Sequence, residues 1–229
     1  MKNIKLFILM LILSVSSVTF SQVNWNSTLV NTGATTIYDL GSNSTPQWIA
    51  QDPNNPNNIH AIVMSSPVGD PSTYPGRRTK YYFSSDGGVT WEFTANVNDR
   101  KSGFPSLSVT SDGSAAICNY GSTLNNTSTH NIIYLDAAAG LGSFTAYETP
   151  SGFVNNFFGK FCLTSNILSP IKFILMGQSF TSDSSFITNG PNPWSQWSYF
   201  ANNSPEGYSS ARGQDGRIGI VYIQNGTEL

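Results

Sequence analysis

Residues 84–91 of this chain read Ser-Ser-Asp-Gly-Gly-Val-Thr-Trp. Two strand-like segments flank this stretch, Lys-Tyr-Tyr-Phe at 80–83 and Glu-Phe-Thr at 92–94. The stretch predicts a hairpin turn, because Asp86 can accept hydrogen bonds within the turn and the two glycines after it tolerate positive φ. Trp91 then begins the returning strand with a large apolar side chain.

The spacing Ser-x-Asp-x-Gly-x-Thr-Trp resembles, at each defined position, the Asp-box or bacterial neuraminidase repeat of sialidases, sortilin-type receptors and many secreted β-propellers. In those families the box closes the third and fourth strands of a propeller blade, at the edge away from the binding face. The resemblance implies a structural role for Ser84, Asp86, Gly88, Thr90 and Trp91. Replacing Trp91 by Ala is expected to cost roughly 3–5 kcal/mol if the indole is buried.

A strand-turn-strand unit recurs along the chain. An Asp or Asn marks its turns, at Asp52, Asp112, Asn166 and Asp215, which are 60, 54 and 49 residues apart. A second series of turns follows at Asp86, Asp136 and Asn189, with spacings of 50 and 53 residues. The two series keep the same period, as expected if each unit is one propeller blade.

The strands expected around the first series of turns are 48–50 with 59–64, 106–109 with 115–120, 160–164 with 171–176, and 208–212 with 218–223. The segments 61–64, 171–176 and 218–223 are almost continuously apolar, which is typical of strands buried on both faces. Further hairpins are expected at 131–148 and around a turn at 188–191. The sequence therefore predicts an all-β fold, a β-propeller of four-stranded blades with about three and a half blades present.

Residues 1–21 have the basic start, apolar centre and small-residue end of a secretory signal peptide. The apolar run 6–13 is far shorter than the roughly 20 residues of a membrane span, so we expect a secreted protein with no span after cleavage. Residues 22–46 are an N-terminal segment and a candidate closing strand, and 47–229 form the propeller. Because the last unit contains only two strands, we expect the reading frame to continue beyond Leu229.

The charge and the cysteine content bear on which kinds of partner and site the protein can have. A net charge of −2 with 10% charged residues gives no basic surface for nucleic acid. Cys118 and Cys162 each lie in an apolar run. Export makes a disulfide chemically possible, but two buried thiols are favoured because nothing in the sequence shows that the cysteines meet. His60 and His130 are isolated and are interpreted as strand-edge residues. No motif indicates a metal site or a cofactor.

The loops opposite the 84–91 turn are the expected binding rim. The longest, 66–78, contains Asp70 and three candidate binding residues, and the loop 96–104 contains two more. The candidate binding residues are Tyr74, Arg77, Arg78, Arg100 and Phe104. Aromatic rings stack on the apolar face of a sugar while Arg and Asp bind its hydroxyls, so this composition favours a glycan. Ordinary loop composition, with the Phe side chains packed into the core, is the alternative. For Arg77 and Arg78 the alternative is solvation at the surface.

Two functions stay open. The first is a secreted module that binds a glycan or an extracellular protein. The second is a sialidase-like exo-glycoside hydrolase whose remaining catalytic residues lie beyond residue 229. Such an enzyme needs three arginines, an acid, and a Tyr activated by a Glu, and the candidates here are Glu206 and Asp70. The family's Arg-Ile-Pro-type motif is missing, since residues 44–48 read Ser-Thr-Pro-Gln-Trp, and this favours the binding module.

Overall fold

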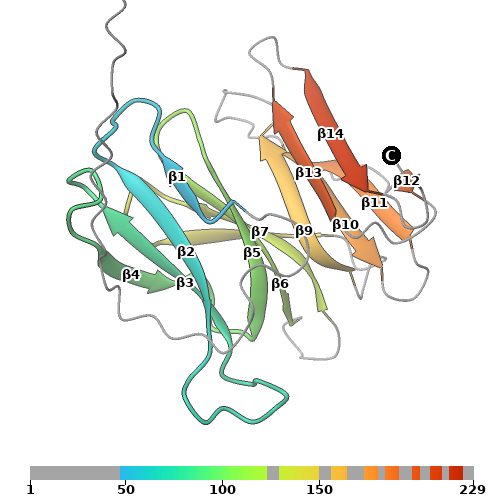
Figure 1. The fold of residues 1–229 in the computed structure, drawn as a ribbon, viewed down its shortest axis with the longest axis horizontal. Coiled ribbons are helices and arrows are strands. Elements are labelled where there is room, and N and C mark those ends of the chain that lie inside the picture. Colours follow the sequence, from blue (N-terminus) through green and yellow to red (C-terminus); the bar gives the residue numbers. More distant parts are fainter. Residues whose placement is uncertain are drawn as a thin grey trace, which may run out of the picture.

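The computed structural model describes residues 47–122, 129–149, 156–163, 173–179, 184–190, 198–201, 207–212 and 217–223. Regular structure in these ranges consists of β-strands, which form three four-stranded antiparallel sheets and one two-stranded sheet (Figure 1). This confirms the predicted all-β fold of four-stranded blades. Within the same ranges, no helix is long and apolar enough to cross a membrane. The predicted signal peptide, the segment 22–46 and Glu206 lie outside the described residues.

The strands of each sheet, or blade, follow one another in space as they do in sequence. Blade 1 contains β1 (Ile49–Gln51), β2 (Ile59–Ser65), β3 (Arg78–Ser84) and β4 (Glu92–Asn96). Blade 2 contains β5 (Ser102–Val109), β6 (Ala115–Ser122), β7 (Thr129–Asp136) and β8 (Phe144–Glu148). Blade 3 contains β9 (Asn156–Leu163), β10 (Phe173–Ser179), β11 (Ser184–Gly190) and β12 (Ser198–Ala201), and the last sheet contains β13 (Gly207–Arg212) and β14 (Ile218–Ile223).

The antiparallel order sorts the connections onto two rims. β2 pairs with β3 from Ile59 opposite Ser84 to Ser65 opposite Arg78, so the β3–β4 turn and the β2–β3 loop lie at opposite ends of blade 1. The loop from β4 to β5 returns to the same rim as the β2–β3 loop. Three of the five predicted binding residues lie in these two connections. The other two, Arg78 and Phe104, lie near the start of the strand that follows each connection.

Neighbouring blades pack through the first strand of the later blade. β5 packs against β1, β2 and β3, and β9 packs against β5, β6 and β7. β6 of the middle blade is buried along its whole length, whereas β2 alternates between buried and partly buried residues. Val221 and Tyr222 of β14 are 72% and 40% exposed, so the prediction that 218–223 is buried on both faces is wrong. In the described part of the chain, β6 lies in a blade with a neighbouring blade on each side. The last sheet has a neighbouring blade on one side, which leaves residues of β14 exposed.

The interface between blades 1 and 2 holds a hydrophobic core. Its buried members are Ala50, Ile62, Tyr81, Val97, Leu107, Ala115, Ile117, Ile132 and Tyr134. Phe144 of β8 packs edge-on against the ring of Tyr81, with centroids 5.5 Å apart. Each large apolar side chain buried here contributes about 1.5–3 kcal/mol to stability, which fixes the two blades and the rim above them.

The turn predicted at residues 188–191 is wrong for its first three residues. β11 continues to Gly190, which pairs with Phe173, and Asn189 pairs with Ile174 of β10. An Asn-Gly pair is a strong local turn signal. Here pairing with the full length of β10 keeps the Asn-Gly pair in β11.

The turn at 84–91 is held by its own polar side chains. The Ser84 hydroxyl donates to Asp86 Oδ1 at 2.8 Å and accepts from the Gly88 amide at 2.9 Å. Asp86 accepts from the Thr90 hydroxyl at 2.6 Å and from its amide at 2.9 Å, and these hydrogen bonds lower the pKa of Asp86 to about 2. The half-buried Trp91 donates from Nε1 to the Gly88 carbonyl at 3.1 Å. Gly88 has a φ of 90°, which favours glycine there.

Candidate binding rim

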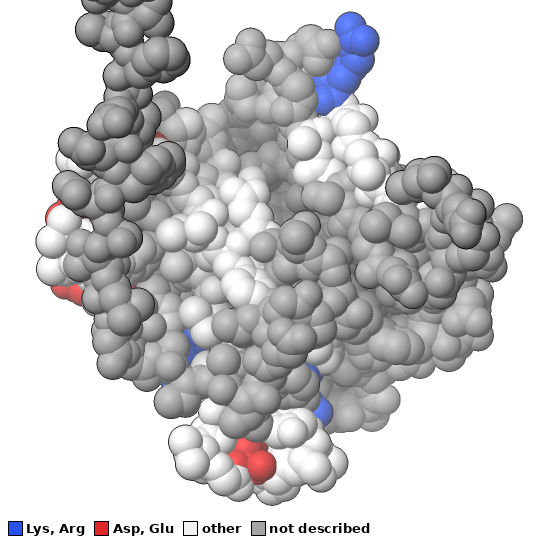
Figure 2. Space-filling model, viewed as in Figure 1, with Lys and Arg blue, Asp and Glu red and all other residues white. Residues whose placement is uncertain are grey.

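The β2–β3 loop, residues 66–77, projects from the body of the molecule (Figure 1). Figure 2 shows that this projecting part is mostly uncharged, with a small group of acidic atoms. The Asp70 carboxylate closes the loop, because it accepts from the Ser66 hydroxyl at 2.5 Å and from the Gly76 amide at 3.0 Å. In this structure the predicted acid Asp70 therefore joins the two ends of the loop.

Arg77 ends this loop and is 3% exposed. Its Nε donates to the Ser102 carbonyl at 2.9 Å, and its Nη2 donates to the Tyr120 hydroxyl at 2.6 Å. The guanidinium carbon lies 5.6 Å from the ring centroid of Phe104 and 5.0 Å from that of Tyr120. These two rings stack at 5.4 Å with 15° between their planes. Surface solvation, which was the alternative for Arg77, is therefore wrong: the side chain connects blade 1 to blade 2.

Two aromatic residues on this rim have an unusual backbone. Among the described residues, Tyr74 and Phe104 are the non-glycine residues with positive φ, at 50° and 48°. The Tyr74 carbonyl accepts from the Arg77 amide at 3.2 Å. Phe104, expected in a loop, belongs to β5, at an irregularity between Gly103 and Ser106. Such a backbone conformation costs on the order of 1–3 kcal/mol for a bulky residue, so the surrounding structure must hold both residues in place.

Two further cations lie around the loop. Lys101 Nζ donates to the Thr73 carbonyl at 2.5 Å, and burial together with the nearby Arg77 lowers the pKa of Lys101. Arg78 is partly exposed and donates from Nη1 to the carbonyls of Pro75 and Arg77, each at 2.9 Å. Lys101 thus joins the β2–β3 loop to the β4–β5 connection, and Arg78 contacts the backbone at the end of the loop.

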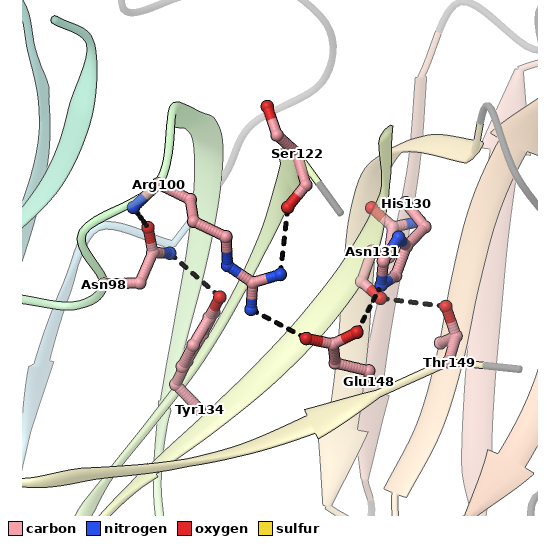
Figure 3. Close-up of polar contacts among 8 residues, drawn as sticks. All are labelled: Asn98, Arg100, Ser122, His130, Asn131, Tyr134, Glu148 and Thr149. Carbon is pink, nitrogen blue, oxygen red and sulfur yellow. Dashed lines mark hydrogen bonds and ion pairs between the residues drawn. The ribbon is translucent and has the colours of Figure 1, made fainter. Parts of the chain in front are cut away.

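Arg100, in the β4–β5 connection, reaches across blade 2 (Figure 3). Its Nη1 donates to the Ser122 carbonyl at 3.0 Å, and its Nη2 lies 2.7 Å from Glu148 Oε1 at the end of β8. The Arg100 amide donates to Asn98 Oδ1 at 2.9 Å, and Asn98 Nδ2 donates to the Tyr134 hydroxyl at 2.9 Å. Burial raises the pKa of Tyr134 to about 12, so this phenol stays protonated at neutral pH.

His130 of β7 lies beneath this pair and is 6% exposed. Its Nε2 is 3.3 Å from Glu148 Oε2, so the two oxygens of one carboxylate face an arginine and a histidine (Figure 3). Burial lowers the pKa of His130, although Glu148 acts in the opposite direction. A lowered pKa favours an uncharged His130 imidazole at neutral pH, so the ion pair in this cluster is the one between Arg100 and Glu148.

Sequence reasoning placed Tyr74, Arg77, Arg78, Arg100 and Phe104 on one rim, and the structure brings Arg77 and Phe104 into contact. Tyr120 and Glu148 were not among the predicted residues, because both lie in strands and the binding rim was expected in the loops. The position of Glu148 at the end of a predicted strand was the available signal. In the described part of the chain, no three His, Cys, Asp or Glu side chains are placed to hold a metal ion.

The two cysteines lie in neighbouring blades. Cys118 is buried in β6, and β6 packs against β9, the strand that contains Cys162. The side chain of Cys162 lies outside the described part of the structure. The preference for two buried thiols over a disulfide therefore stays a prediction.

The sequence matches no protein-family model and no curated protein. Among solved structures, the chain is similar to the Hadza microbial sialidase Hz136, with a TM-score of 0.53 and 11% identity over 76% of this chain and 39% of that protein. A mutant of AofleA from Arthrobotrys oligospora gives a TM-score of 0.47 and 13% identity over 75% of this chain and 47% of that one. The similarity to the sialidase shows a shared β-propeller fold. This chain spans 39% of that protein's length.

Proposed function

We propose that this protein is a secreted Asp-box β-propeller that binds a glycan on the rim formed by the β2–β3 loop and the start of β5. The observation that carries the proposal is a pair of strained aromatic residues. Tyr74 precedes Arg77 by three residues in the loop, and the Arg77 guanidinium lies over the ring of Phe104. Gly, Asn or Asp would adopt their backbone conformation with less strain. Two bulky aromatic side chains at such positions, both partly exposed on the rim, favour a role in ligand contact.

The same rim argues for binding over hydrolysis of a sialoside. A carboxylate clamp needs arginines whose paired N–H groups face the ligand. Arg77 is buried between blades, and its Nε and Nη2 groups donate to Ser102 and Tyr120 of the protein itself. The likeness to a sialidase supports the fold, and hydrolysis stays the alternative that the experiment must exclude.

The test is glycan retention by the exported protein on an immobilised glycan panel, together with a fluorogenic sialoside assay. We expect retention without turnover, and at least a tenfold loss of affinity on Tyr74→Ala, in line with the binding energy of a stacked aromatic anchor. The control is Phe93→Ala, because Phe93 is 53% exposed on the outer strand β4, away from this rim.

Turnover that Glu206→Gln abolishes would overturn the binding assignment in favour of the hydrolase. Equal retention by the Tyr74→Ala and wild-type proteins would show that the glycan binds elsewhere. Failure of every glycan to bind, with retention of an extracellular protein instead, would replace the glycan by a protein partner.

A further inference from the structure

The pair formed by Arg100 and Glu148 lies at the surface of the blade 2 rim. The side chain of Arg100 is 18% exposed and that of Glu148 is 36% exposed. A carboxylate on a guanidinium is the arrangement that an acidic ligand group adopts when it binds an arginine. Glu148 therefore occupies the position on Arg100 that such a group would take.

Arg100 is held in place by contacts that do not involve Glu148. Its amide is fixed by Asn98, which is fixed in turn by the Tyr134 hydroxyl, and its Nη1 is fixed by the Ser122 carbonyl (Figure 3). When the Glu148 carboxylate is removed, the Nη1 contact with Ser122 still holds one side of the guanidinium, and its Nη2 side becomes open. A donor that is held in place before the ligand arrives lowers the ordering cost of binding.

Glu148 also lies beside a second side chain, which it can still face after it has moved away from Arg100. His130 Nε2 lies 3.3 Å from its other carboxylate oxygen. The ion pair is partly open to solvent, and a pair in such a position makes only a modest contribution to stability, so another anion can replace Glu148 on Arg100.

We propose that the blade 2 rim is an anion-binding site closed by its own carboxylate: Glu148 covers Arg100, and a sulfate or carboxylate group on a saccharide takes its place. The site lies beside the glycan-binding rim, and its role in saccharide recognition rests on the proposed function. Glu148 is then a specificity residue, because its negative charge weakens the binding of acidic ligands and leaves the binding of neutral ligands unaffected.

The test follows the Arg100 side-chain Nε–Hε signal by NMR during titration with inorganic sulfate, galactose, galactose 6-sulfate and galacturonate. These sugars differ at one position, so the sulfate and carboxylate classes are compared on one scaffold. Relative to wild type, Glu148→Gln should bind the three anions about three- to tenfold more tightly and leave galactose unchanged, as expected for one restored charge-assisted contact. Arg100→Gln in the Glu148→Gln background lacks this signal, so its affinity for the same anions is measured by calorimetric titration, and the gain should be absent.

The matched control is Glu92→Gln, which removes the same charge at the start of the outer strand β4, where Glu92 is exposed. If Glu148→Gln does not fold, Glu148→Asp shortens the carboxylate and should give a smaller gain in the same direction. A gain of equal size in Glu92→Gln, or no gain for inorganic sulfate in either Glu148 variant, would overturn the proposal. Because inorganic sulfate is not a sugar, that result is independent of whether the protein binds glycans.

Discussion

Arg77 Nη2 donates a hydrogen bond to the Tyr120 hydroxyl at 2.6 Å and so joins the β2–β3 loop of blade 1 to β6 of blade 2. Its sequence neighbour Arg78 begins β3 and is partly exposed. Two adjacent arginines with the same chemistry thus have different environments. The first connects two blades, and the second contacts the backbone of its own loop.

This difference predicts unequal effects of alanine substitution. Arg77→Ala removes two hydrogen bonds and two cation–aromatic contacts from a buried site, and should lower the free energy of unfolding by about 2–4 kcal/mol. Arg78→Ala should lower it by less than about 1 kcal/mol. Urea denaturation of the two variants measures both values, and similar losses would contradict the assigned role of Arg77.

A second prediction concerns the contact between the first turns of blades 1 and 2. Gly113 has a φ of 87°, and a Cβ at this position would overlap the Asp52 carboxylate. Asp52 is 5% exposed and already accepts from the Asn54 amide at 2.8 Å, so it has little room to move. Gly113→Ala should destabilise the protein by about 2–4 kcal/mol.

Gly219 supplies the control for this substitution. A Cβ there would meet no atom within 4 Å, and Gly219 lies in β14. Gly219→Ala should change the stability by less than about 1 kcal/mol, with stabilisation expected because Ala restricts the unfolded chain. Thermal unfolding of both variants tests the pair, and a Gly113→Ala protein as stable as wild type would show that the turn relaxes freely.

A third prediction is a loss of stability in mild acid. His60 is fully buried and its Nδ1 lies 2.7 Å from the Tyr81 hydroxyl. Burial lowers the pKa of His60 below 6.5, against the opposing effects of Asp52 and the Gly113 backbone. The unfolded chain therefore binds more protons below pH 6.5, so the free energy of unfolding should be highest above about pH 7 and fall as the pH drops through 6.5.

Denaturation curves between pH 5 and pH 8 measure this fall, whose slope for one histidine is at most about 1.4 kcal/mol per pH unit. His130 acts in the same direction, because its pKa is also lowered by burial. His60→Gln and His130→Gln should each flatten the curve, which separates the two contributions. A stability that is constant from pH 5 to pH 8 would refute the buried, neutral state of both rings.

The fourth prediction revises the expected effect of truncating Trp91. The indole is half-buried, and its Nε1 donates to Gly88 at 3.1 Å within the same turn. Trp91→Ala should therefore cost about 2 kcal/mol, below the roughly 3–5 kcal/mol of a fully buried ring. Glycan affinity should be unchanged, because the turn and the loop 66–77 lie on opposite rims. Selective loss of binding in a stable Trp91→Ala protein would contradict this arrangement.

Several strands and turns were predictable from sequence because their signals are local. The strands 218–223 and 115–120 were expected almost where β14 and β6 lie, since runs of apolar residues bounded by Asp-Gly turns define a strand by themselves. The turn at 84–91 was predictable for the same reason, because its hydrogen bonds join residues at most four positions apart. The same local reading failed at Asn189, where pairing with Ile174 decides the structure.

The sequence by itself thus determined a meander of four-stranded units and the rim on which each connection lies, because alternation of strand and turn is encoded by neighbouring residues. The tertiary structure alone decided that Arg77 is buried against Tyr120 and that Arg100 is covered by Glu148, contacts that join residues 43 and 48 positions apart. It also decided that Val221 is exposed in an apolar strand. Burial and pairing of these side chains depend on which blade lies beside them, and that information is not local to any segment.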